Sequence, residues 1–341
     1  LVGVRVEHHR REVEGGEPLH QRTTGARSAT DERGQDEIGG KRQLGVGHGT
    51  RIGDSCELTP APACREGYLR HMHPIEHLRY VARAHGVDPG ALVEETAHAL
   101  GSLHFDPSGL VVAARRIVER HPFTGPLWWL CSNVTTSAEP FEAVWDLAAE
   151  IRSDRTASEL ADALPDDADV VTIGDPNLSA DGLARRGDVR VLALDVEHSA
   201  TSFVRRLERY DVEYEPVEAG VAGAATRVAD VVLVEAMALD TERVVVPSGS
   251  STIAASASAW DTPVWLVAGV GRRLPTGYLD AMVDAVAALA ADQDEWTLGV
   301  EVLPTSLITH VVGPRGIMPM KPHAAQPECP FAAELLRRSA M

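Results

Sequence analysis

The stretch that decides the fold is VLVEAMALDTERVVVPSGSSTIAASA, residues 232–257. It begins like a buried strand and ends in a turn of serine and glycine that runs into an alanine-rich helix. A strand followed by a small-residue turn and a helix is how an α/β protein presents the free amides of a helix N-terminus to an anion. The turn contains no Lys or Arg. We therefore expect the amides of Ser250–Thr252 to hold an anion only weakly.

Apolar runs of strand length, separated by amphipathic helical stretches, continue this pattern along the chain. The runs are PLWWLC (126–131), ADVVTIG (168–174), DVRVLALD (188–195), ADVVLVEA (229–236) and TPVWLVAG (262–269). Between them, residues 201–210 and 278–290 have the apolar period of a helix. This alternation predicts a Rossmann-like α/β domain over residues 126–318, with a parallel sheet and helices on both faces. Such sheets bind ligands beyond the carboxyl ends of their strands.

A small helical subdomain is predicted over residues 72–125, and a C-terminal tail over residues 319–341. The helices of the subdomain are expected to begin at Pro74, after Asp88 and after Asp106, because a proline at the first helical position favours a helix start.

Residues 1–71 differ from the rest of the chain. They hold 12 of the 29 glycines and show neither a strand period nor a helix period. We expect this segment to be disordered or a non-native extension, with the true start of the chain near Met72, rather than a working flexible arm.

The net charge of −18 comes from 50 acidic against 32 basic residues, of which only Lys41 and Lys321 are lysines. Residues 72–341 carry all of it, with 21 basic against 39 acidic residues. Such a surface repels nucleic acid and anionic membranes, so neither is expected as a partner. Depleted lysine with excess acid predicts a halophilic protein; the alternative is a GC-rich genome that encodes Arg in place of Lys. With no apolar run long enough to span a membrane, a cytoplasmic protein is expected.

Motifs of the common enzyme classes are missing. GVGHGT (45–50) has no strand before it, and GVGRRL (269–274) lacks the third glycine of a dinucleotide site. There is no lysine-containing phosphate loop and no GxSxG. The four cysteines form no CxxC pair, and His198 and His310 have no partner at ligand spacing. We therefore expect neither a cofactor nor a metal.

Four segments, in this order, resemble a known superfamily. They are LWWLCSNVTTSAEPFEAVW (127–145), DVRVLALDVEHS (188–199), the stretch 229–267 around the opening quotation, and VEVLPTSLITHVVGPRGI (300–317). Over residues 74–318 the chain is similar to the initiation factor 2B α/β/δ-subunit superfamily, which includes methylthioribose-1-phosphate isomerase and ribose-1,5-bisphosphate isomerase. The resemblance implies a sugar- or nucleotide-phosphate ligand and assembly as a homodimer or with related subunits.

The resemblance also places the isomerase residues on this chain. A Thr-His-Cys-Asn-type signature after the first strand falls on LCSN, which makes Cys131, Ser132 and Asn133 candidates. The Gly-Ala-Asp signature falls on residues 235–237, where Met237 replaces a carboxylate that acts as general acid or base. Glu235 and Asp240 flank this position, and either would replace the lost aspartate through a shift of register.

Two further signatures of the superfamily concern the sugar phosphate. The Asn-Lys-Ile-Gly-Thr turn falls on residues 246–250, which keep the glycine and lose the lysine, and the Glu-Thr-Arg-Pro signature falls on residues 197–200, which keep only the glutamate. The ligand-binding candidates implied are Asn133, Glu197, Glu235, Gly249, Ser250, Ser251 and Thr252.

Two hypotheses of function follow from these residues. The first, which the lost Asp, Lys and Arg favour, is a non-catalytic binder of a sugar or nucleotide phosphate or of a protein partner. The second is an aldose–ketose isomerase with rearranged residues, in which Cys131, Ser132 and Asp240 take the acid/base roles. A serine hydroxyl needs a neighbouring base to replace a thiol, and a thioether moves no proton.

The acidic excess predicts that the protein needs salt. At low ionic strength the Debye length grows to about 30 Å, so the negative charges repel one another and destabilise the compact state. We expect the melting temperature to rise steeply from millimolar to molar KCl, as measured by thermal unfolding. A melting temperature that does not change with salt would remove the support for a halophilic protein.

Overall fold

The computed structural model of the chain describes residues 76, 80, 83, 88–103, 107–195, 201–294 and 297–337. The predicted extension 1–71, the start near Met72, most of the helix expected from Pro74 and the ligand candidate Glu197 lie outside these residues. All of the described residues fall in one compact unit. None of the helices that they form is both long enough and apolar enough to cross a membrane.

A mostly parallel sheet lies at the centre of the described part of the chain, with seven strands in the order β10-β9-β7-β4-β1-β2-β3. The strands are β1 (Asp169–Ile173), β2 (Arg190–Asp195), β3 (Glu213–Glu218), β4 (Val231–Glu235), β7 (Val264–Val267), β9 (His310–Gly313) and β10 (Gly316–Pro319). Among these strands, only β10 pairs antiparallel, at the edge of the sheet. The predicted α/β fold is confirmed, and β1, β2, β4 and β7 lie within the apolar runs that predicted them.

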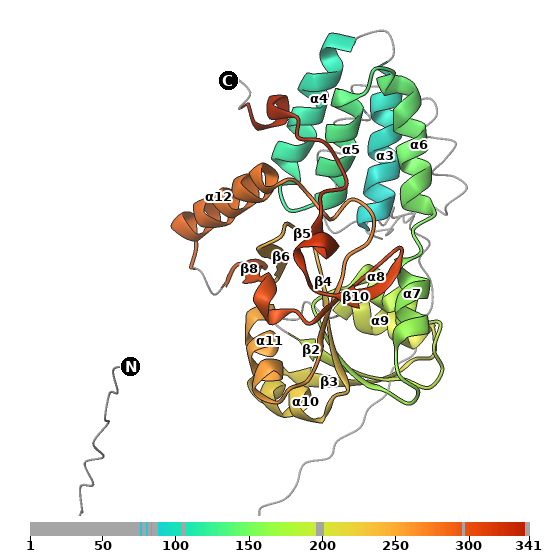
Figure 1. Ribbon diagram of the computed structural model, residues 1–341, viewed down its shortest axis with the longest axis vertical. Coiled ribbons are helices and arrows are strands. Elements are labelled where there is room, and N and C mark those ends of the chain that lie inside the picture. The colour runs from blue at the N-terminus through green and yellow to red at the C-terminus, as the bar shows by residue number, and fades with distance from the viewer. Residues whose placement is uncertain are drawn as a thin grey trace, which may run out of the picture. The chain divides into compact units, whose positions relative to one another are not determined.

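Helices cover both faces of this sheet (Figure 1). One face packs on α10 (Ala222–Val228) and α11 (Ser250–Ala259), and the other packs on α7 (Thr156–Ala163), α8 (Asn177–Leu183) and α9 (Thr201–Arg209). Successive strand residues point to opposite faces, so Val171 joins the first of these cores and Val170 the second. Every residue of the central strand β4 is buried, which explains its continuous apolar sequence.

Helices α3 (Pro89–Gly101), α4 (Pro107–Arg120), α5 (Gly125–Thr136) and α6 (Pro140–Arg152) pack against one another before the sheet begins. Helix α5 contains residues 126–131, which the sequence analysis predicts as a strand, and that prediction is wrong. A short apolar run does not distinguish a buried strand from a buried helix. Here Pro126 lies in the first turn, and the buried residues continue to Val134, beyond the length of the run.

The opening stretch of sequence builds more than one strand, a turn and a helix. After β4 the chain forms a hairpin of β5 (Ala238–Leu239) and β6 (Arg243–Pro247), and β8 (Val300–Pro304) pairs antiparallel with β6 to complete a small second sheet. The serine-rich turn therefore follows β6 of the small sheet, not β4 of the main sheet. Helix α12 (Thr276–Asp292) lies beside β6 and β8 and projects to the side in Figure 1.

Short 3-10 turns complete the described structure. They lie at Ala219–Val221, Thr305–Leu307, Pro322–Ala325 and Ala333–Leu336. The last two belong to the predicted C-terminal tail, whose residues Ala325, Cys329 and Leu335 are buried. The described part of the tail therefore packs on the rest of the protein.

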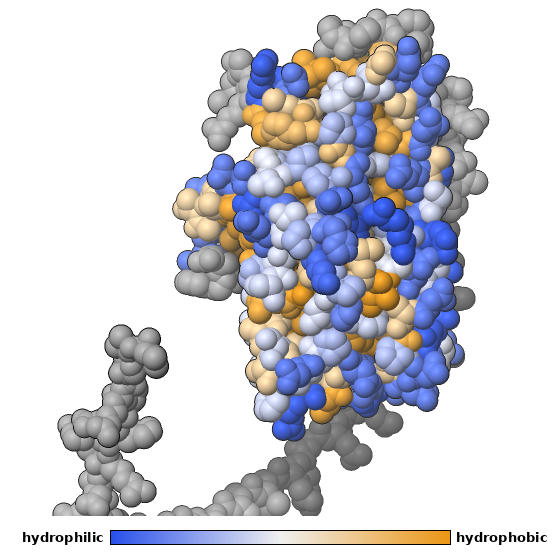
Figure 2. All heavy atoms as spheres, in the orientation of Figure 1, coloured by the Kyte–Doolittle hydropathy of each residue, from blue (hydrophilic) through white to orange (hydrophobic). Residues whose placement is uncertain are grey.

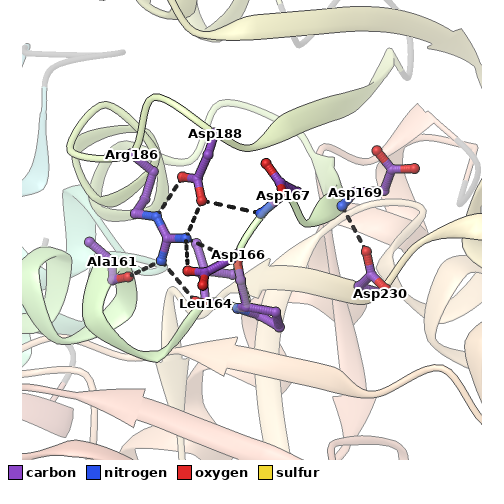
Figure 3. A network of polar contacts seen from close by, with 9 residues as sticks. Ala161, Leu164, Asp166, Asp167, Asp169, Arg186, Asp188 and Asp230 are labelled. Atoms are coloured by element: carbon purple, nitrogen blue, oxygen red, sulfur yellow. Dashed lines mark hydrogen bonds and ion pairs between the residues drawn. The ribbon is translucent and has the colours of Figure 1, made fainter.

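Arg186 forms a network of hydrogen bonds at the amino ends of strands β1 and β2 (Figure 3). The Arg186 guanidinium donates to the carbonyls of Ala161 at 2.9 Å and Leu164 at 2.8 Å, at the end of α7. It also donates to both carboxylate oxygens of Asp188, at 2.8 and 2.6 Å. Asp188 in turn accepts from the backbone amide of Asp167 at 3.1 Å. Arg186 thus joins the last carbonyls of α7 to the segments that lead into β1 and β2.

Protonation of the Asp188 carboxylate should lower the stability of the protein at acidic pH. Hydrogen bonds from Arg186 and from the Asp167 amide lower the pKa of Asp188 below its ordinary value of 3.8. A group whose pKa is lowered by folding contributes stability above its unfolded pKa and loses that contribution as the pH falls through the folded pKa. We expect Asp188→Asn to lower the melting temperature at about pH 7 and to have a shrinking effect below about pH 4.

Asp162→Asn is the matched control, because Asp162 is an exposed aspartate on α7. The melting temperature of the Asp162→Asn variant should equal that of the wild type at each pH. A deficit of Asp188→Asn that stayed constant down to about pH 2 would show that the carboxylate charge is not what stabilises this network.

Candidate functional site

The serine-rich turn between β6 and α11 has a tightly defined backbone. Gly249 has a φ of 89°, in the left-handed region where a side chain is strained, so glycine is required here. The Ser250 hydroxyl donates to the carbonyl of Pro247 at 2.6 Å, and the Ser248 hydroxyl donates to the carbonyl of Leu298. Both hydroxyls therefore stabilise the turn itself.

A carboxylate of the chain itself lies at the start of α11. Glu301 comes from β8, and its Oε1 accepts the backbone amide of Ser251 at 2.6 Å. The first turn of α11 has no acidic residue of its own, and its N-cap residue, Gly249, has no side chain that could cap the helix. A negative charge is favourable at a helix N-terminus. The amides of Ser250–Thr252 were expected to hold an external anion. One of them, that of Ser251, instead donates to Glu301.

The carboxyl end of β4 is filled by a buried ion pair. Glu235, the last residue of β4, lies 2.9 Å from the Arg272 guanidinium, and each side chain is only 7% exposed. The other oxygen of Glu235 accepts from the amide of Ser179 at 3.0 Å and from its hydroxyl at 3.2 Å. Arg272 also donates to the carbonyl of Ala236. Glu235 is therefore saturated by partners from the chain.

Asp240 organises the hairpin between β5 and β6. Its side chain is 3% exposed and accepts the backbone amides of Glu242 at 2.9 Å and Arg243 at 2.7 Å. The guanidinium of Arg243 donates a third hydrogen bond, to Oδ2 of Asp240, at 2.7 Å. These contacts are those of a turn-forming aspartate, and they leave Asp240 poorly placed to exchange protons with a ligand.

The candidates Cys131, Ser132 and Asn133 lie in α5, not at the edge of the sheet. Cys131 is fully buried, and burial raises the pKa of its thiol to about 12. Ser132 is also fully buried, with Oγ 2.8 Å from the hydroxyl of Tyr278 in α12. The Asn133 side chain donates to the carbonyl of Trp129 at 3.0 Å, one turn earlier in α5. Ser132 and Asn133 thus have structural hydrogen-bond partners, and Cys131 belongs to the hydrophobic core.

The first strand of the main sheet is β1, and Gly174 and Asp175 directly follow its carboxyl end. Gly174 has a φ of 75°, and a Cβ there would come within 3.2 Å of the Pro247 side chain. The turn before α11 therefore lies beside the carboxyl end of β1. Asp175 accepts a hydrogen bond from the Ser202 hydroxyl and lies 3.7 Å from the Arg206 guanidinium.

The sequence analysis missed Asp175, Arg272 and Glu301. A signal for Asp175 exists, because the apolar run 168–174 ends in Gly and is followed by Asp. Arg272 stands in GVGRRL, which was judged only as a dinucleotide motif. Glu301 has no local signal, since it meets Ser251 through the pairing of β6 with β8.

Two hollows lie around these residues. The larger, about 1210 Å³, is lined by the turn, by α11, α12 and β8, and by the ends of β1 and β2; among its described lining residues Glu301 is the only charged one. The smaller, about 740 Å³, lies between α3, α6 and α8, and its charged residues are Asp88, Glu94, Arg152, Asp154, Asp181, Arg185 and Arg272. Within the described ranges, no group of three or more His, Cys, Asp or Glu is arranged to hold a metal ion.

Solved structures identify the class of protein that has this fold. No protein-family profile matches the sequence, and no curated protein sequence matches it. The structure is similar to the translation initiation factor eIF-2B of Pyrococcus horikoshii, with a TM-score of 0.61 and 15% identity, over 74% of this chain and 98% of that chain. The chain thus has the fold of the initiation factor 2B subunits, and the fold that the resemblance implied is confirmed.

Two further solved structures are similar. The tetrameric eIF2B-beta2-delta2 complex of Chaetomium thermophilum matches with a TM-score of 0.60 and 15% identity, over 76% of this chain and 96% of that chain. The 5-methylthioribose 1-phosphate isomerase of Pyrococcus horikoshii matches with a TM-score of 0.53 and 11% identity, over 72% of this chain and 84% of that chain. The fold is therefore shared by subunits of a translation factor and by a sugar-phosphate isomerase, and it does not choose between these functions.

The Glu235–Arg272 pair should be needed for stability. Arg272→Met removes the cation and leaves a buried carboxylate without a counterion, which typically destabilises a protein by about 3–5 kcal/mol. We expect the free energy of unfolding, measured with urea, to fall by about this amount. The double variant Glu235→Gln with Arg272→Met should regain most of the loss, because no uncompensated charge remains.

Arg185→Met is the control for the loss of an arginine, because Arg185 is exposed at the end of α8. Its free energy of unfolding should stay within about 0.5 kcal/mol of the wild type. Equal stability of Arg272→Met and Arg185→Met would mean that the buried pair does not hold the carboxyl end of β4.

Proposed function

We propose that this chain is a non-catalytic protein of the initiation factor 2B-subunit kind, which acts by binding a protein partner and not by isomerising a sugar phosphate. The observation that carries the proposal is the Glu235–Arg272 pair at the carboxyl end of β4. The resemblance puts the catalytic carboxylate two residues later, at Met237, and the Glu235 carboxylate that flanks this position is already paired with Arg272.

The remaining residues lack the chemistry of an isomerase. Moving a proton between two carbons needs a group that ionises near the working pH and lies within reach of the substrate. Met237 has no ionisable proton, and burial raises the pKa of Cys131 to about 12. Ser132 is bonded to Tyr278 in the core, and Asp240 is bonded within its hairpin. None of these side chains is free to act on a substrate.

The same geometry favours a protein partner over a phosphate ligand. A phosphate site needs cations or free amides. Of the described residues that line the larger hollow, the charged one is Glu301, which accepts the amide of Ser251. A carboxylate there repels a phosphate. One structural neighbour is a tetrameric complex of beta and delta subunits. We therefore propose that the partner of this chain is a second copy of itself or a related subunit.

An activity assay tests the absence of catalysis. Incubation with 5-methylthioribose 1-phosphate or ribose 1,5-bisphosphate should give no ketose between about pH 6 and pH 9, because Cys131, Ser132 and Asp240 are all held in structural positions away from a substrate. The Pyrococcus horikoshii isomerase, assayed in parallel with 5-methylthioribose 1-phosphate, is the positive control. Product that disappears in Ser132→Ala or in Asp240→Asn would overturn the proposal in favour of the isomerase.

Sedimentation measures the assembly directly. In molar KCl the chain, with a mass of 36.6 kDa, should sediment as a dimer or as a complex with a related subunit. A monomer that stays monomeric at all concentrations, and with a related subunit added, would leave the choice of a protein partner without support.

A further inference from the structure

The larger hollow, called here the α12 cleft, has mainly apolar walls. Val283, Val286 and Ala287 of α12 line it together with Ile253 of α11 and Val302 of β8. Helix α12 projects beside the small sheet in Figure 1, and Figure 2 shows apolar residues gathered on this projecting part of the molecule. At about 1210 Å³ the cleft is large enough for a small organic molecule.

Polar groups converge on the apolar walls from the turn before α11. Ser248, Ser251 and Thr252 line the cleft there, next to Glu301. Glu301 is half-buried, and its Oε1 is used by the Ser251 amide. Its other oxygen, Oε2, accepts no hydrogen bond from any described residue. Within the described ranges, one carboxylate oxygen of this lining residue is thus left for a donor in the cleft.

We propose that the α12 cleft binds a small organic ammonium ion, with an alkyl or aryl body between α12 and α11 and the ammonium on Glu301. The complementary charge is a single cation, because Glu301 is the only charged residue among the described lining residues. An ammonium donates to a carboxylate through a charge-assisted hydrogen bond, which is stronger than a neutral one. The Glu301 carboxylate repels phosphates and carboxylates. The backbone amide of Ser251 continues to donate its hydrogen bond to Oε1 of Glu301.

The ligand class is tested with three probes that share one apolar body: n-hexylamine, 1-hexanol and hexanoate. Hexylamine is protonated at about pH 7, as lysine is. We expect calorimetry or ligand-observed NMR on the full chain, at fixed salt, to show binding of hexylamine, with hexanol and hexanoate weaker by about tenfold or more. Equal binding of all three, or tighter binding of hexanoate, would overturn the proposal.

Two variants test where the ammonium group and the apolar part of the ligand bind. Glu301→Gln keeps an oxygen for the Ser251 amide but removes the charge, so hexylamine should bind about tenfold more weakly while hexanol is unaffected. Ala287→Phe puts a ring into the cleft from an exposed position on α12, and should block all binding without loss of stability.

Glu142→Gln is the matched control, because Glu142 is exposed on α6 in the helical part and makes the same change of net charge. It should bind hexylamine as the wild type does. An equal loss of affinity in Glu142→Gln and Glu301→Gln would mean that the amine senses only the overall charge of the protein. Wild-type affinity in Ala287→Phe would mean that it binds elsewhere, and either result would overturn the proposal.

Discussion

The ion pair between Glu235 and Arg272 joins three segments at the carboxyl edge of the sheet. Glu235 ends the central strand β4, Arg272 follows β7, and Ser179 of α8 bonds the second oxygen of the carboxylate. Because a buried charge without its partner is strongly destabilising, neither residue of the pair can be lost alone. The arrangement closes the place where parallel sheets of this kind usually hold a ligand.

A second carboxylate, that of Glu301 in the small sheet, also binds a group of the chain itself, at the start of α11. Glu301 brings a carboxylate from β8 to an amide that would otherwise face solvent or a ligand. At both places a charged side chain of the protein pairs with groups of the chain itself, so that polar groups of the chain bind one another.

Periodicity predicted the sheet well and failed at one helix. The runs at 168–174 and 229–236 are buried strands, because residues covered on both faces must be apolar throughout. The run at 126–131 is also apolar, but it packs among other helices and is buried as part of α5. That single error concerns the segment that holds the candidates Cys131 and Ser132, which lie buried in α5 and not at the edge of the sheet.

The sequence by itself determined the α/β class and the acidic composition, because burial periods and residue types are local properties. Only the tertiary structure decided which groups meet. Glu301 reaches Ser251 across 50 residues, and Arg272 reaches Glu235 across 37. Such pairs depend on strand order and register, which bring distant segments together. No local pattern of residues encodes them.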